Sequence, residues 1–201
     1  MATPRREQER SKVTRQRLME ACVECLVERG WSGTTTTIVA ERAGVSRGAQ
    51  LHHYPTRGEL VAAAVVYVGR ARAAEILEAA RRLPVGPRRT EAVLGLLADF
   101  YSGPLFAAAL ELWVAARTDE LVHEVVAPLE AQLGREAHKV AVELLGAREG
   151  RPGVRELIQA TLDLLRGLGL AGVLTDDRER RRRILRQWAR TLDRELARQY
   201  P

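Results

Sequence analysis

Residues 34–60, TTTTIVAERAGVSRGAQLHHYPTRGEL, decide the fold of the N-terminal third of the chain. Thr35 is placed to cap a short helix that Gly44 ends, because glycine readily adopts the positive φ of a helix end. Ser46 is placed to cap a second short helix, which Pro55 ends. Two short helices joined by a glycine turn predict a helix-turn-helix.

A longer helix is expected on each side of this motif. Before it, apolar side chains recur at helical spacing over residues 14–29, and Gly30 ends the pattern. After it, Thr56 and Glu59 have the spacing of a capping box, which predicts the start of a long helix.

The remainder of the chain is also expected to be helical. It contains no asparagine, and alternating apolar and polar runs are hard to find, which argues against an antiparallel β fold. Segment 83–87, with two prolines and a glycine, separates it from the first part. Five further helices are expected, over residues 90–101, 104–118, 120–145, 154–174 and 177–199. The sequence therefore predicts an all-α protein.

Composition limits the classes of function. The 201 residues carry a formal charge of +6, which favours an anionic partner such as nucleic acid. Cys22 and Cys25 cannot form a disulfide framework, and zinc needs four ligands, so both are expected to be small core side chains. No export signal or apolar run of about 20 residues is present, so a cytoplasmic protein is expected.

Residues 39–48 (VAERAGVSRG) and 52–60 (HHYPTRGEL) resemble the DNA-binding domain of the TetR family of transcriptional regulators. The resemblance extends over about residues 14–66. It implies an all-α fold whose N-terminal helices bind operator DNA and whose larger C-terminal domain binds a small molecule and dimerises. The implied division is a basic N-terminal arm (1–12), a helix-turn-helix domain (13–55), a connecting helix (56–83) and an effector-binding and dimerisation domain (84–201).

The helix-turn-helix supplies groups that suit DNA. Arg47 can reach a guanine edge, and Gln50 either contacts adenine or lies half buried. Hydroxyl and amide groups at the start of the first short helix can bind phosphate oxygens. The candidate DNA contacts are Thr35, Thr36, Thr37, Arg47, Gly48, Ala49, Gln50, His52, His53, Tyr54 and Arg57.

Three positions depart from the family pattern, and one candidate has an alternative role. Ala49, Gln50 and Leu51 stand where relatives commonly carry Thr, a bulky aliphatic residue and Tyr, so a divergent operator is expected. Family members usually pack the aromatic residue at Tyr54 against the domain core.

Basic side chains also cluster at the start of the chain. Residues 5–17 hold six basic side chains against two acidic ones, which suits either a flexible arm that follows phosphates or a solvated tail.

Two further clusters are candidates for an effector site and a dimer interface. An apolar cavity with one cationic group is expected from Phe100, Tyr101, Phe106, Leu110, Trp113 and Arg117. An anionic or carbonyl-bearing ligand is favoured if Arg117 points inward, and that interpretation fails if it points outward. Apolar stripes on the last two helices predict a homodimer interface of Leu157, Thr161, Leu165, Leu168, Leu185, Trp188 and Leu192.

Other patterns are given a structural interpretation. Residues 167–172 match G-x-G-x-x-G, but a helical stripe precedes them where a dinucleotide site needs a strand, so they are expected to let a neighbouring helix approach closely. The arginines at 178 and 180–183 are expected to be a solvated rim or partners of acidic groups. His123 and His138 lack the spacing of a metal or catalytic site, and no cofactor, metal or enzymatic activity is expected.

The sequence thus predicts a homodimer that binds a palindromic operator and is released by a small apolar effector. The alternative is a dimeric small-molecule binding or scaffold protein whose helix-turn-helix no longer functions. The same DNA contacts would serve a repressor or an activator.

Overall fold

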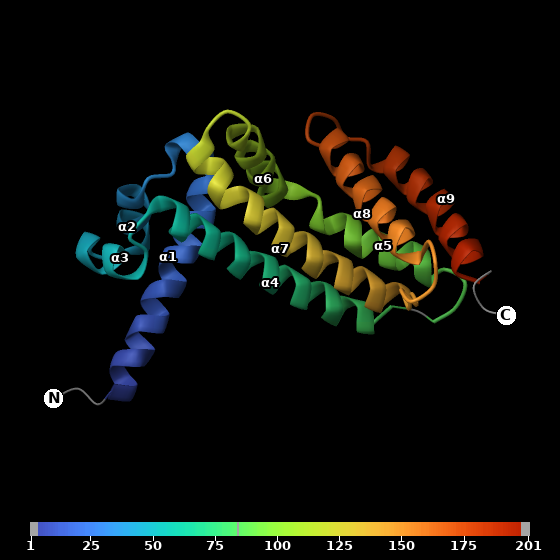
Figure 1. Cartoon of the computed structure of the whole chain (residues 1–201), viewed down its shortest axis with the longest axis horizontal. Coiled ribbons are helices and arrows are strands. Elements are labelled where there is room, and N and C mark those ends of the chain that lie inside the picture. Colours follow the sequence, from blue (N-terminus) through green and yellow to red (C-terminus); the bar gives the residue numbers. More distant parts are fainter. Residues whose placement is uncertain (1–3, 84, 198–201) are drawn as a thin grey trace. The chain divides into compact units, whose positions relative to one another are not determined.

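The computed structural model describes residues 4–83 and 85–197, and within these ranges it contains helices and no strand (Figure 1). The all-α prediction is confirmed. In chain order the helices are α1 (Pro4–Gly33), α2 (Thr36–Ala43), α3 (Arg47–His53), α4 (Arg57–Arg81), α5 (Arg89–Phe100), α6 (Gly103–Ala116), α7 (Glu120–Leu145), α8 (Val154–Ala171) and α9 (Arg178–Ala197).

Helix α1 begins earlier than the sequence pattern indicates. Residues 4–12, expected as an arm, are helical, because Glu, Gln, Arg and Lys are good helix formers and Pro4 suits a first helical position. Lys12 also pairs with Glu9 at 3.5 Å, one turn earlier. Residues 1–3 of the arm, Pro84 and the expected helix end at Gln199 lie outside the described residues.

The chain divides into two compact units, each with its own packing. The first comprises residues 1–70 and 107–131, and the second comprises residues 71–106 and 132–201. The first unit therefore adds most of α6 and the first half of α7 to the helix-turn-helix region.

The core of the first unit is built on α1. Leu18, Cys22, Cys25 and Leu26 are buried on one face of α1, together with apolar side chains of α2, α4, α6 and α7. Both cysteines are free thiols, and burial raises the pKa of Cys22 to about 12, so they are core side chains as expected.

In the second unit, α5 packs against both α8 and α9, which also contact each other. The Trp188 indole donates a hydrogen bond of 3.0 Å to the Thr161 hydroxyl between α9 and α8. Gly169 of α8 is buried, and a methyl group there would collide with the Tyr101 carbonyl and touch the Phe106 ring. The glycine thus lets α6 and the segment before it approach α8 closely, as the sequence indicates.

The remaining polar clusters are structural. Arg178 pairs with Asp176 at 2.6 Å and Arg180 with Asp177 at 3.0 Å, in line with the expected acidic partners. His138 is buried and lies 2.6 Å from Glu149. Across residues 4–83 and 85–197, no group of His, Cys, Asp and Glu could hold a metal ion. In the same ranges no single helix is long and apolar enough to cross a membrane, although the bent pair α5–α6 passes that test jointly by length and composition.

Candidate nucleic-acid interface

The two short helices of the motif are set by local caps. The Thr35 hydroxyl accepts a hydrogen bond of 3.2 Å from the Ile38 amide at the start of α2. Gly44 has φ 63° and ψ 36°, and its amide donates to carbonyls of the last turn of α2. The Ser46 hydroxyl then accepts from the Ala49 amide at 3.3 Å and starts α3. These caps and the turn are as the sequence predicts.

An ion pair holds α2 on α1. The Arg42 guanidinium lies 2.5 Å from the Glu28 carboxylate and 3.5 Å from Glu24. This pairing keeps the pKa of Glu28 below its usual range. Arg42 therefore serves to fix the angle of the motif.

Gln50 faces the protein interior, which settles the choice left open by the sequence. It is 1% exposed, and its side-chain amide donates a hydrogen bond of 2.6 Å to the Tyr54 carbonyl at the end of α3. A side chain that is buried and hydrogen-bonded in this way cannot reach adenine. The prediction that Gln50 contacts a base is therefore wrong. The reason is register: positions 50 and 54, four apart, lie on the inner face of α3 and its cap.

Arg57 also has an internal role. Its guanidinium carbon lies 3.6 Å from the centre of the Trp31 ring, and the same side chain donates to the Trp31 carbonyl. Burial lowers the pKa of Arg57, whose side chain is half-buried. Arg57, one of the candidate DNA contacts from the sequence, thus makes a cation–π contact within the first unit.

The C-terminal end of α3 is partly anchored. Tyr54 packs against the core of the first unit, and burial raises its pKa, as the family alternative implied. His53 is half-buried, and its pKa is lowered first by burial and then by His52 and Arg15. His52 itself is exposed and meets the His53 ring edge-on.

The outer face of α3 consists of four exposed residues, Arg47, Gly48, Leu51 and His52. Ala49 is half-buried between these two faces. Thr35 and Thr37 are exposed at the start of α2, whereas Thr36 is half-buried. Leu51 was not among the candidates from the sequence, although its spacing of four from Arg47 indicates the same exposed helix face.

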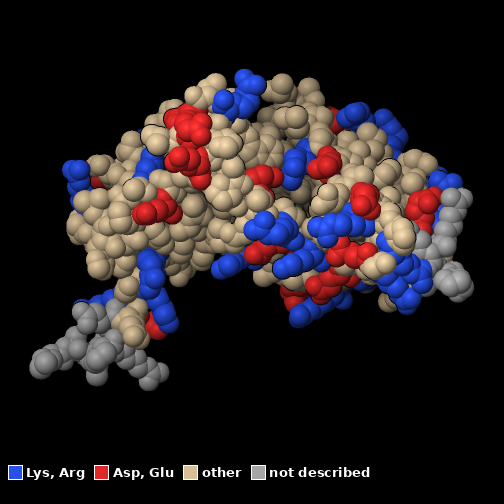
Figure 2. All heavy atoms as spheres, in the orientation of Figure 1, with Lys and Arg blue, Asp and Glu red and all other residues tan. Residues whose placement is uncertain are grey.

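Basic side chains of α1 extend this surface within the first unit. Arg10, Lys12, Arg15 and Arg17 are exposed, and Figure 2 shows Lys and Arg atoms along the described part of this segment. The influence of Arg15 on the pKa of His53 places this positive charge near the end of α3.

The predicted effector residues are divided between the two units. Phe100, Tyr101 and Phe106 belong to the second unit, where their rings meet edge-on at 5.4 and 5.8 Å. Leu110, Trp113 and Arg117 belong to the first unit, and Trp113 packs against its core. Arg117 is exposed, so the interpretation of an anionic ligand that depended on an inward Arg117 is withdrawn.

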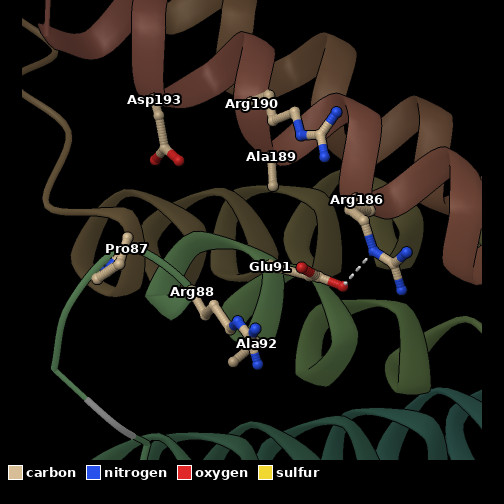
Figure 3. A pocket seen from close by; sticks show the side chains of 8 residues that line it. All are labelled: Pro87, Arg88, Glu91, Ala92, Arg186, Ala189, Arg190 and Asp193. Atoms are coloured by element: carbon tan, nitrogen blue, oxygen red, sulfur yellow. Dashed lines mark hydrogen bonds and ion pairs between the residues drawn. The ribbon is translucent and has the colours of Figure 1, made fainter.

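The second unit contains a cleft of about 810 Å³ between the first turn of α5 and the second half of α9 (Figure 3). Arg186 of α9 pairs with Glu91 of α5 at 3.3 Å beside it, and Thr90 donates to Asp193 at 2.5 Å. Five of the eight side chains that line the cleft are charged. Its lining residues are Pro87, Arg88, Glu91, Ala92, Arg186, Ala189, Arg190 and Asp193.

Most side chains predicted to form the dimer interface are instead buried inside the chain. Five of its side chains are buried within the second unit: Thr161, Leu165, Leu168, Leu185 and Leu192. Leu157 and Trp188 are half-buried. The apolar stripes of the last two helices are therefore real, but α5 packs against both helices. The spacing of apolar residues does not reveal which element packs on them.

Comparison with known proteins agrees with this architecture. The family described as "Bacterial regulatory proteins, tetR family" matches residues 18–64, which span α2, α3 and parts of α1 and α4. An uncharacterised HTH-type transcriptional regulator of Mycobacterium tuberculosis is 32% identical over 143 residues, which cover 71% of this chain and 73% of that protein. The HTH-type transcriptional regulator CymR of Pseudomonas putida is 30% identical over 195 residues and 92% of each chain.

Solved structures show the same fold. A putative transcriptional regulator from Pseudomonas aeruginosa superposes with a TM-score of 0.72 at 24% identity, over 93% of each chain. The multidrug binding protein EbrR, solved with imidazole, proflavin and malachite green, gives a TM-score of 0.63 for the imidazole complex at 21% identity, over 87% of this chain and 93% of EbrR. The chain therefore belongs to the TetR family of bacterial transcriptional regulators, which bind DNA and are not enzymes.

Proposed function

We propose that this chain is a ligand-responsive repressor that binds a palindromic operator as a homodimer in the cytoplasm. The observation that carries the proposal is the outer face of α3, where Arg47, Leu51 and His52 are exposed while Gln50 and Tyr54 anchor the opposite face. Recognition of the major groove requires a helix whose inner face is anchored to the protein and whose outer face is exposed.

The contacts divide by chemistry. Arg47 is proposed to bind a guanine edge, because its guanidinium is exposed at the start of α3 and makes no ion pair among the residues that the structure describes. Thr35 and Thr37 are proposed to bind phosphates. The Thr35 oxygen already accepts from the Ile38 amide, which leaves its hydroxyl proton available for a phosphate oxygen.

Two copies are needed to read a palindrome. Two recognition helices that enter successive major grooves have centres about 34 to 36 Å apart. The proposed contact between copies lies on the outer side of α8 and just beyond its end, where Leu170 and Leu174 are 57% and 90% exposed. Large apolar side chains exposed this far favour association.

Ligand response is proposed for the second unit. Phe100 is half-buried there beside the buried rings of Tyr101 and Phe106, and it is the aromatic side chain proposed to contact an apolar effector. EbrR, of the same fold, binds aromatic dyes. An effector can release the operator only if it binds the DNA-free arrangement of the dimer more tightly.

The decisive experiment is selection of bound fragments from a random duplex library at low and moderate salt, after native mass spectrometry has checked the protein for a retained ligand. Enrichment of an inverted repeat supports the proposal. Enrichment of no sequence by ligand-free protein would contradict it and favour the scaffold alternative.

Ligand response has a separate test, in which malachite green serves as the probe. The dye is titrated against the protein alone, and then against the complex with the selected operator. Saturable binding that releases DNA is expected, whereas binding without release would contradict an effector role.

A further inference from the structure

The orientation of α3 is set by its inner face. Gln50 is buried and bonded to the Tyr54 carbonyl, and Tyr54 packs on the core of the first unit. Both contacts are internal, so the helix cannot rotate without breaking them. The outer face is consequently defined by the residues that these contacts leave exposed.

Leu51 is unusual on that outer face. It is 44% exposed, and its neighbours there are Arg47 one turn earlier, Gly48 and His52. A leucine has no hydrogen-bonding group, so it cannot bind a phosphate or a polar base edge. The exposed part of this apolar surface has no partner in the first unit, although its burial would be favourable.

The chemistry of the major groove offers one apolar partner for such a side chain. The C5 methyl group of thymine is the apolar group on the major-groove edges of the bases. We propose that Leu51 reads a thymine through its C5 methyl group, and thereby determines one position of the operator half-site. The inference rests on the proposed function, because it names what one residue of that same surface recognises.

The spacing on α3 also indicates where this thymine lies. Arg47 and Leu51 are four residues apart, so they are displaced by about 6 Å along the helix axis. That displacement corresponds to about two base-pair steps. We therefore expect the thymine within about two base pairs of the guanine that Arg47 contacts.

Gly48 supports close approach of the bases. It lies on the exposed face between Arg47 and Leu51, and a methyl group added there would meet nothing within 4 Å. The space in front of α3 is thus open, and without a side chain at this position DNA can come near the helix backbone. A short apolar side chain at Leu51 then suffices to reach the groove floor.

The test uses the operator obtained by selection and replaces each thymine in turn by deoxyuridine, which removes only the methyl group. For the wild-type protein, deoxyuridine at one position per half-site should weaken binding about fourfold, the value of one buried methyl group. Leu51→Ala should bind the thymine operator more weakly and be indifferent to deoxyuridine at that position. Leu51→Met should retain most of the discrimination.

Two controls separate this contact from general effects. Leu121→Ala removes another exposed leucine of the first unit, 76% exposed on α7, and should keep the full deoxyuridine penalty. Arg47→Ala should also keep it, because the methyl contact is made by a different side chain. Circular dichroism of Leu51→Ala should match wild type, since alanine is a good helix former and the anchors of α3 at Gln50 and Tyr54 are unchanged.

The outcomes distinguish this inference from the proposed function. If an inverted repeat is selected but no deoxyuridine affects the wild-type protein, Leu51 does not read thymine, although the repressor proposal stands. The same holds if Leu51→Ala retains the whole penalty. If no sequence is selected, the proposed function fails, and the inference fails with it.

Discussion

Arg47 and Arg57 lie ten residues apart, yet their guanidinium groups have opposite environments. Arg47 is exposed on the outer face of α3, whereas Arg57 is half-buried against the Trp31 ring. Charge and proximity to the motif are therefore insufficient to identify a DNA contact. The two residues are expected to respond differently to the same substitution.

Arg57→Ala is predicted to act on stability. Loss of the stacked guanidinium and of its bond to the Trp31 carbonyl should lower the free energy of unfolding by about 2 kcal/mol. Chemical denaturation measures this, and the slope of DNA affinity against salt should stay unchanged. Arg57→Lys should not restore stability, because an ammonium lacks the planar face; full rescue by lysine would instead show that the positive charge alone stabilises the protein.

Arg47→Ala is the matched comparison for Arg57→Ala. The free energy of unfolding of this variant should match that of wild type. Its preference for the operator base over the other bases at one position per half-site should fall by about 1 to 3 kcal/mol. Competition binding with operators altered at each position measures this preference. Equal behaviour of the two alanine variants would show that the division between a base contact and an internal contact is wrong.

Gly48→Ala should separate stability from DNA binding. Alanine forms helix better than glycine and meets no obstacle here, so the free protein should gain about 0.5 kcal/mol of stability. Operator affinity should fall, because the methyl group occupies space that the bases need. Unchanged affinity would mean that DNA does not closely approach the N-terminal turn of α3.

Among the elements, α8 depends on a glycine that lets its neighbours approach closely. Gly169→Ala is predicted to destabilise the second unit by about 2 kcal/mol, because its methyl group collides with the Tyr101 carbonyl of the segment after α5. Gly95→Ala in α5 is the control, since its methyl group meets nothing within 4 Å and should stabilise the helix by up to about 1 kcal/mol. Thermal unfolding of both variants decides the matter; equal effects would refute the packing role.

The first turns of α1 carry a prediction about salt. Replacing Arg10, Lys12 and Arg15 with glutamine keeps the helix formers and removes three positive charges. The slope of log affinity against log salt should fall by about 0.9 for each phosphate that the variant no longer neutralises, with base preference unchanged. Arg70→Gln, an exposed arginine of α4, is the control; a slope equal to wild type in the triple variant would identify this segment as merely solvated.

For the whole molecule, the proposed dimer predicts that charged side chains introduced at the exposed end of α8 abolish binding to a palindromic operator. Leu170→Glu combined with Leu174→Glu should weaken self-association at least about tenfold, because buried carboxylates would lack partners. Sedimentation velocity and binding to the selected inverted repeat measure the effect. Val85→Glu, at a side chain 94% exposed, is the control, and a double variant that remains dimeric would place the interface elsewhere.

The helix-turn-helix, its caps and the all-α fold could all be predicted from the sequence. Thr35, Gly44, Ser46 and the capping box of Thr56 and Glu59 behave as predicted, because each cap bonds only backbone within five residues. Such contacts depend on the local order of residues, so they can be recognised before any folding is known. The helix over residues 120–145 was predicted for the same reason, from periodicity and flanking residues.

Which side chains form the core and which remain exposed depends on tertiary contacts. Gln50 turns inward, Arg57 stacks on a tryptophan 26 positions earlier, and residues 107–131 join the first unit. The apolar stripes of α8 and α9 are covered by α5, far away in sequence. These outcomes depend on contacts between distant segments, whose free energy is set by burial and geometry that no local pattern contains.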